Sequence, residues 1–188
     1  YSRRLDLATG IHTTTWRQDG VTFVREVFAS KPDQAIVVRI SADKPGKVAG
    51  AVRLTGAHRE TTSASGSDAV FSGSLGNGLR QAARVSVRCD GGSAGADGTA
   101  VRFSGDSATL VLAAGTDYAL DPAKKFRSGA DPAETTAKQA AAAVAKPYPA
   151  LREAHLADFR VLMGRVDLDL GAPPDLSITE RLEADRKG

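Results

Sequence analysis

The chain has 188 residues and a mass of 19.6 kDa, which suits one domain or one domain with a helical extension. Its residues are 41% hydrophobic and 25% charged, with a formal net charge of +3, which is an ordinary globular balance. No run approaches the roughly 20 apolar residues of a membrane-spanning helix. Since Cys89 is the single cysteine, a disulfide framework and a zinc site built on several cysteines are both excluded.

The excess of basic residues is small and dispersed. The 25 basic and 22 acidic residues form no run of five or six like charges. A nucleic-acid-binding face needs clustered basic residues, so we expect no nucleic-acid partner. The opening segment from Tyr1 to Leu7 alternates like a strand and has no signal-peptide pattern. We therefore expect the chain to start inside a fold and to be a piece of a longer protein.

Residues 1 to about 115 alternate polar and apolar side chains between turn residues, which is typical of antiparallel strands. Asp19-Gly20 is the strongest hairpin signal, because a type I′ turn needs positive φ at both central positions. The segment 21–28 carries apolar residues on both faces, which predicts a strand between two covering layers. We expect strands over 2–7, 11–17, 21–28, 34–40, 47–54, 69–75, 82–89, 100–103 and 108–113.

These short, evenly spaced strands predict a β-sandwich or barrel. The Ser-, Thr- and Gly-rich stretch 56–68 indicates a surface loop. After residue 128 the composition favours helices. The expected elements there are a helix over 134–145 capped by Asp131, a helix over 149–163, a short strand over 166–170, a break at Pro173-Pro174, and a helix over 177–187 with a Ser177–Glu180 capping box.

The second of these helices carries an apolar stripe. Its members are Leu151, Leu156, Phe159, Leu162 and Met163. We expect this helix to pack on the sandwich through Leu156 and Phe159, with His155 or Asp158 hydrogen-bonded near the junction.

Two glycine-rich segments invite a ligand-binding interpretation. Gly73-Ser-Leu-Gly76-Asn-Gly78 has the glycines of a phosphate loop, but its spacing is wrong and it joins two strands, so a hairpin is favoured. The segment from Asp90 to Gly98 offers oxygens for calcium but lacks the bidentate Glu of a high-affinity loop. A flexible turn is favoured there.

Isolated polar residues give no catalytic or metal centre. His12, His58 and His155 have no i, i+4 partner and no third ligand nearby. Cys89 shares a predicted strand face with Val85 and Val87 and is expected to be a small buried hydrophobe.

Three further residues have ordinary interpretations. Trp16 beside its hairpin favours a core or lid role over sugar stacking. Asp167 and Asp169 share one strand face without a partner, which favours a solvated surface. No Gly-x-Ser-x-Gly elbow occurs, so a serine hydrolase has no support.

Several longer segments follow one another in a family-specific order. The first are Tyr1-Ser-Arg-Arg-Leu-Asp-Leu-Ala-Thr-Gly10, Asp19-Gly20-Val-Thr-Phe-Val-Arg25-Glu26-Val-Phe28-Ala-Ser30 and Pro32-Asp33-Gln34. The later ones are Ala114-Gly-Thr-Asp-Tyr118, Asp121-Pro122, His155-Leu-Ala-Asp158-Phe159-Arg-Val-Leu162, Arg165-Val166-Asp-Leu-Asp-Leu170-Gly171 and Thr179-Glu180-Arg181-Leu182. In these segments the chain resembles glycoside hydrolase family 95, the α-L-fucosidases, some of which act as α-L-galactosidases. Phe159 and Met163 stand where that family often has Tyr and Phe.

The resemblance implies a mainly β fold: an antiparallel super-β-sandwich of the family 65/95 N-terminal type over 1–128, with a C-terminal helical linker over 129–188. The linker would lead toward an (α/α)6 catalytic barrel that this chain lacks. The family is implied to invert the anomeric centre with a Glu general acid and an Asn/Asp arrangement that positions water. Those residues lie in the barrel, so the resemblance gives this chain no catalytic, cofactor-binding or metal-binding residue and no cofactor.

The resemblance therefore implies the non-catalytic portion of a secreted or cell-surface α-L-fucosidase acting on terminal α-L-fucosides or L-galactosides of glycans. Its implied partners are the parent's own barrel and the glycan substrate. An alternative of another class is a stand-alone carbohydrate-binding β-sandwich module. That alternative needs exposed, coplanar aromatic rings, and the chain has one Trp and three Tyr.

Overall fold

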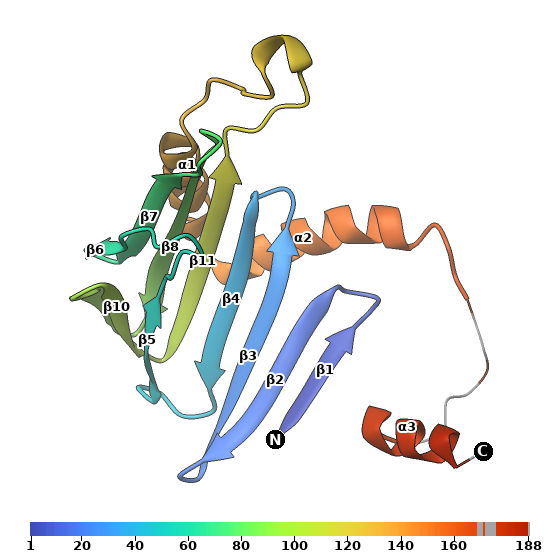
Figure 1. The fold of residues 1–188 in the computed structure, drawn as a ribbon. Coiled ribbons are helices and arrows are strands. Elements are labelled where there is room, and N and C mark those ends of the chain that lie inside the picture. Colours follow the sequence, from blue (N-terminus) through green and yellow to red (C-terminus); the bar gives the residue numbers. More distant parts are fainter. Residues whose placement is uncertain (169–170, 172–175, 188) are drawn as a thin grey trace.

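The computed structural model describes residues 1–168, 171 and 176–187 (Figure 1). Within these residues there are eleven strands, three α-helices and a short 3-10 helix, η1. The strands are β1 Ser2–Asp6, β2 Ile11–Gln18, β3 Val21–Ser30, β4 Ala35–Ala42, β5 Val48–Arg53, β6 Ser63–Ser65, β7 Asp68–Ser74, β8 Arg80–Asp90, β9 Ser93–Asp97, β10 Ala100–Gly105 and β11 Ser107–Thr116. The helices are η1 Pro122–Lys124, α1 Pro132–Val144, α2 Tyr148–Met163 and α3 Ile178–Arg186.

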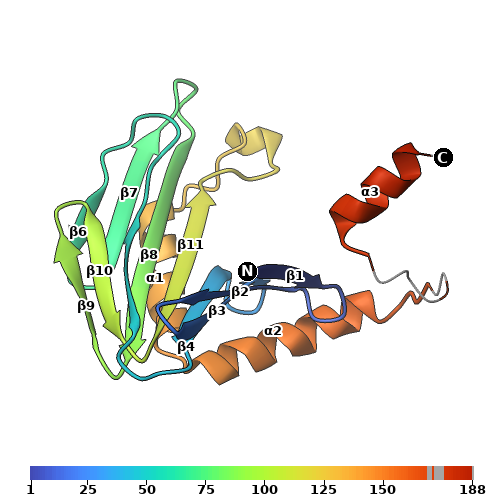
Figure 2. The same cartoon turned by 90° about the horizontal axis from the view of Figure 1, so that it is seen from below.

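The strands form two antiparallel sheets. The large sheet has the order β1-β2-β3-β4-β11-β8-β7-β6, and the small sheet has the order β5-β10-β9. The small sheet lies over the half of the large sheet that contains β7 and β8, while α1 and α2 lie on the opposite face (Figure 2). The expected mainly β, antiparallel, sandwich-like fold with a helical C-terminal part is confirmed.

The face of the large sheet that the helices cover holds one hydrophobic core. Period-two alternation along β3 directs Phe28 to this face, where it meets Leu151 and His155 of α2. A hydrogen bond also joins α2 to β3: the Tyr148 hydroxyl donates to the Glu26 carboxylate at 2.8 Å. The buried members of this core are Ile11, Phe28, Ala35, Val37, Val111, Ala143, Leu151 and Leu156.

The opposite face holds a second core between the two sheets. The buried residues that build it are Val48, Ala69, Val85, Val87, Val101, Phe103, Ala108 and Leu110. Since β8 and β11 contribute to both faces, they form the middle layer between α1 and the small sheet. In β11 this agrees with the sequence, because residues 110–114 are apolar without interruption, whereas β8 alternates apolar residues with Arg84, Ser86 and Arg88.

Helix α2 packs on the sheet as its apolar stripe predicts. Leu156 is buried, and His155 lies 2.8 Å from the carbonyl oxygen of Thr9 through its Nε2 atom. Phe159 is half-buried against the His155 ring and Gly10. The predicted packing and the predicted role of His155 as a hydrogen-bonder are confirmed. The last two residues of the stripe, Leu162 and Met163, are exposed, so the end of α2 does not pack on the sheet.

Three short-range expectations are wrong. The predicted surface loop 56–68 contains β6, and the predicted flexible turn after Asp90 contains β9. Both strands are rich in Ser, Ala and Gly, and they form because β7 and β10 offer them a hydrogen-bonded edge. Residues 166–168 are not in a strand, and the rest of that predicted strand, like Pro173-Pro174, lies outside the described residues.

Candidate functional site

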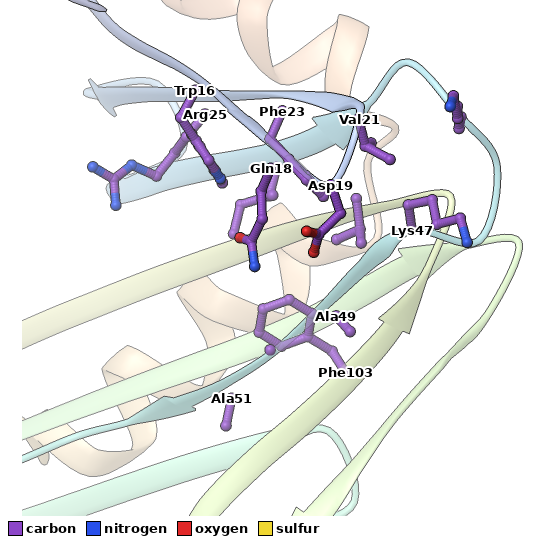
Figure 3. A pocket seen from close by; sticks show the side chains of 14 residues that line it. Trp16, Gln18, Asp19, Val21, Phe23, Arg25, Lys47, Ala49, Ala51 and Phe103 are labelled. Atoms are coloured by element: carbon purple, nitrogen blue, oxygen red, sulfur yellow. The ribbon is translucent and has the colours of Figure 1, made fainter. Parts of the chain in front are cut away.

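A groove opens where the small sheet stops covering the large one. It has a volume of about 670 Å³. The β2–β3 hairpin forms one wall, and β5 with the Phe103 ring of β10 forms the other (Figure 3). Gln18 and Asp19 extend from the hairpin toward Phe103 and Ala49, so polar and aromatic groups face each other across the groove.

The hairpin wall follows from alternation and cross-strand pairing. Val21, Phe23 and Arg25 share the groove side of β3, and Trp16 of β2 lies opposite Phe23 in the register. The Trp16 and Phe23 rings stack with centroids 5.3 Å apart and an interplanar angle of 12°. Both rings are only half-buried, so among the described residues the groove side of β3 is fully covered at Val21 but has no second layer over Phe23 and Arg25. The predicted second layer is absent here, and that expectation is wrong for this part of the chain.

The β5 wall is built from very small side chains. Ala49, Gly50 and Ala51 line it, and a Cβ at Gly50 would lie 2.8 Å from the Phe103 ring. Glycine therefore lets the β5 backbone approach the ring closely. β5 is an edge strand of the small sheet, as β9 is, and its other edge has no strand partner among the described residues.

The charges at the groove are mainly positive. Arg25, Lys44 and Lys47 line it, and none of the three takes part in an ion pair within residues 1–168. Asp19 is the single carboxylate among the described lining residues, and it sits on the exposed hairpin turn with a φ of 50°. The groove can therefore hold a polar ligand, but it does not present two facing carboxyl groups.

A second polar cluster lies at the end of β11. Asp117 is buried; its Oδ1 accepts from the Arg80 backbone N–H at 2.9 Å and its Oδ2 from Arg80 Nε at 3.0 Å. Burial alone would raise the pKa of Asp117, but these hydrogen bonds and the charges of Arg80 and Arg127 outweigh it and hold that pKa below its usual range. Sequence reasoning missed this residue, because its partners lie 37 and 10 positions away with no local motif.

Asp117 is expected to make stability sensitive to acid. Because its pKa is lower in the folded state, its contribution is complete above the unfolded-state pKa and is lost as the pH falls below about 4. Urea unfolding at pH 6 and pH 3 should show a smaller drop in stability for Asp117→Asn than for the unchanged protein. The exposed Asp167→Asn variant is the control and should retain the full drop. Equal drops in all three proteins would contradict this assignment.

The residues singled out from sequence do not come together. His12 lies on β2, His58 in the 54–62 connection and His155 on α2, and the described residues hold no cluster of three potential metal ligands. Asp167 is exposed, and Asp169 lies outside the described residues. The Gly73–Gly78 segment is the predicted β7–β8 hairpin, closed by the Leu75 and Gly78 backbone N–H groups.

Two other sequence candidates have structural partners. Asp90 accepts hydrogen bonds from Arg39 at 2.8 Å and Ser107 at 2.9 Å, which lower its pKa. Cys89 lies on β8 and packs against the core between the sheets, as its alternation with Val85 and Val87 predicts. It is half-buried instead of fully buried, because it is near the end of the strand; burial raises the pKa of its thiol.

The architecture defines a class of protein: a sandwich-like β-domain with a helical C-terminal part and a groove at its open side. The sequence profile of the glycosyl hydrolase family 65 N-terminal domain matches residues 1–121. Since this is more than half of the chain, the chain belongs to this family of glycosidase N-terminal domains.

Two curated relatives carry fucosidase names. Alpha-L-fucosidase 2 of Arabidopsis thaliana is 27% identical over 90% of this chain, and probable alpha-fucosidase A of Aspergillus oryzae is 30% identical over 96% of it. A solved structure of a putative kojibiose phosphorylase from the human microbiome shares the fold with a TM-score of 0.56 at 11% identity, over 84% of this chain. The chain spans 23% and 27% of the two relatives and 24% of the solved chain, about a quarter in each case. Within the described residues, no helix has the length and apolar character needed to cross a membrane.

Proposed function

We propose that this chain is the non-catalytic N-terminal sandwich and linker portion of an inverting α-L-fucosidase of glycoside hydrolase family 95. The longer protein would hydrolyse terminal α-L-fucosides, or L-galactosides, of glycans. The fucosidase names of two relatives that align with 90% and 96% of the chain support the substrate class. Such substrates are extracellular glycans, so we place the parent outside the cell or at its surface.

The observation that carries the non-catalytic role is the single carboxylate of the groove. Inverting hydrolysis needs a general acid and a second group that activates water, about 6.5–9.5 Å apart. Asp19 is exposed on a turn and has no second carboxyl group facing it among the described lining residues. A general acid of this kind also lies in an apolar pocket, whereas Asp19 is exposed on the hairpin turn.

The exposed end of α2 supports packing against another domain of the same polypeptide. Phe159 is half-buried, whereas the apolar residues that follow it along the chain are exposed. These residues are Val161, Leu162, Met163, Val166 and Leu168. Several large apolar side chains exposed within one short segment are typical of an interface, and we propose that the catalytic barrel of the parent covers them.

A stand-alone carbohydrate-binding module is the second candidate. The observation in its favour is the half-exposed, stacked Trp16–Phe23 pair beside the polar groove. Affinity electrophoresis of the purified chain in glycan-containing gels, with Trp16→Ala as the comparison, separates this candidate from the first. Retention that Trp16→Ala abolishes would favour the binding module.

The type of reaction is tested on the longer protein that contains this chain. We expect it to release fucose from 2′-fucosyllactose in the absence of phosphate. Cleavage of kojibiose that requires inorganic phosphate, with no action on fucosides, would contradict the proposal and favour a phosphorylase.

A further inference from the structure

The segment 117–128 forms a loop that we call the aromatic loop. It leaves the end of β11 and carries η1 at its tip, beyond the end of the large sheet (Figure 1). Three large apolar side chains are exposed on it: Tyr118 is 54% exposed, Leu120 85% and Phe126 42%. The Tyr118 and Phe126 rings are parallel within 2°, with centroids 6.3 Å apart.

The aromatic loop is fixed at its base. Ser128 N–H donates to the Asp117 carbonyl at 2.7 Å, and Tyr118 pairs with Arg127 in an isolated antiparallel bridge. The buried Asp117 holds Arg80, and Arg80 Nη2 donates to the carbonyl of Ala130 at 2.8 Å. These contacts tie both ends of the loop to β8.

The tip holds an unfavourable backbone conformation. Lys125 and Phe126 both have positive φ, at 51° and 59°. Such values are rare for side chains other than Gly, Asn and Asp, and a bulky aromatic residue there is an outlier. Hydrogen bonds maintain it, because Phe126 N–H donates to the Asp121 carbonyl at 2.9 Å and Ala119 N–H donates to the Phe126 carbonyl at 3.2 Å. Strain held by surrounding contacts is typical of binding elements.

We propose that the aromatic loop is a preorganised docking element that inserts into an apolar surface with an acidic rim on the remaining part of the same polypeptide. The proposal rests on the proposed function, in which this chain is part of a longer protein. The match covers only 23% and 27% of the two fucosidase relatives, so about three quarters of each relative lies outside it. Lys124 is paired with Asp121, whereas Lys125 is in no ion pair within the described residues, which leaves the tip cationic. Leu120 makes the tip apolar, and a fixed loop loses little conformational entropy on docking.

The test measures side-chain accessibility in the longer protein by hydroxyl-radical footprinting. A synthetic peptide of residues 117–128 gives the fully exposed oxidation rates, so the comparison does not depend on the isolated chain folding. We expect Leu120, which is 85% exposed in this chain, to be oxidised several-fold more slowly in the longer protein; Tyr118 and Phe126 are already about half covered here and do not decide the test. Rates equal to those of the peptide would overturn the proposal, whatever the protein does to fucosides. Protection that appears only when 2′-fucosyllactose is added would also overturn it and assign the loop to glycan contact.

A pair of variants provides a second readout. Leu120→Ser in the longer protein should lower its thermal unfolding midpoint by several degrees, because an apolar contact with the partner surface is lost. Ala123→Ser, at an exposed position of η1 in the same loop, is the matched control and should have no effect. Equal midpoints for both variants and the unchanged protein would overturn the proposal.

Discussion

Replacing Leu151 with Ala is expected to lower the free energy of unfolding by about 2–5 kcal/mol, the range of Leu→Ala changes at buried sites. Leu151 is fully buried where α2 meets the large sheet, in the same core as Phe28, Val37 and Val111. The change removes apolar contact and leaves a cavity that α2 and the sheet cannot close without moving. Urea unfolding followed by far-UV circular dichroism measures the loss.

Leu162→Ala is the matched control for this variant. Leu162 lies on the same helix but is 50% exposed, so the same chemical change should cost less than about 1 kcal/mol. Similar losses for the two variants would show that α2 does not pack on the sheet as described.

Gly10→Ala is the second change with a large expected effect. Gly10 adopts a φ of +64° in the turn between β1 and β2, and a Cβ there would lie 2.6 Å from the Phe159 ring of α2. Backbone strain costs about 1–2 kcal/mol, and displacement of the ring adds about 1–3 kcal/mol. We expect Gly10→Ala to lower the free energy of unfolding by about 2–5 kcal/mol, the sum of these two costs.

Gly20→Ala separates the two costs. Gly20 has a similar φ of +71°, but no atom lies within 4 Å of the position that a Cβ would take there. The Gly20→Ala variant should therefore lower the free energy of unfolding by only about 1–2 kcal/mol, the cost of the strained backbone. If the two glycine variants were equally destabilised, Phe159 would not be packed on Gly10. Isothermal urea titrations of both variants give the comparison.

Elements with local causes are predictable from the sequence. The Asp131 side chain caps α1, and Ser177 and Glu180 form the capping box of α3, as their spacing predicts. Asp19 and Gly20 both have positive φ in the predicted hairpin turn. In each case the residues that decide the conformation are within a few positions of one another.

The groove and the buried Asp117 depend on distant residues. Trp16 and β5 line the same groove because β5 does not join the large sheet. It pairs instead with β10, about 50 positions later in the chain. β3 carries apolar residues on both faces, as a strand between two layers does, so its sequence does not reveal that the groove side lacks a full second layer among the described residues. The partition of the strands between two sheets is decided by long-range pairing.

The most direct test of the non-catalytic role is an assay of the purified 188-residue chain beside the longer protein, on 2′-fucosyllactose and an aryl α-L-fucoside. We predict that the longer protein releases fucose and that the 188-residue chain, at equal molar concentration, releases none. Turnover by the 188-residue chain that disappears in Asp19→Asn, the variant of the groove's carboxylate, would contradict this account.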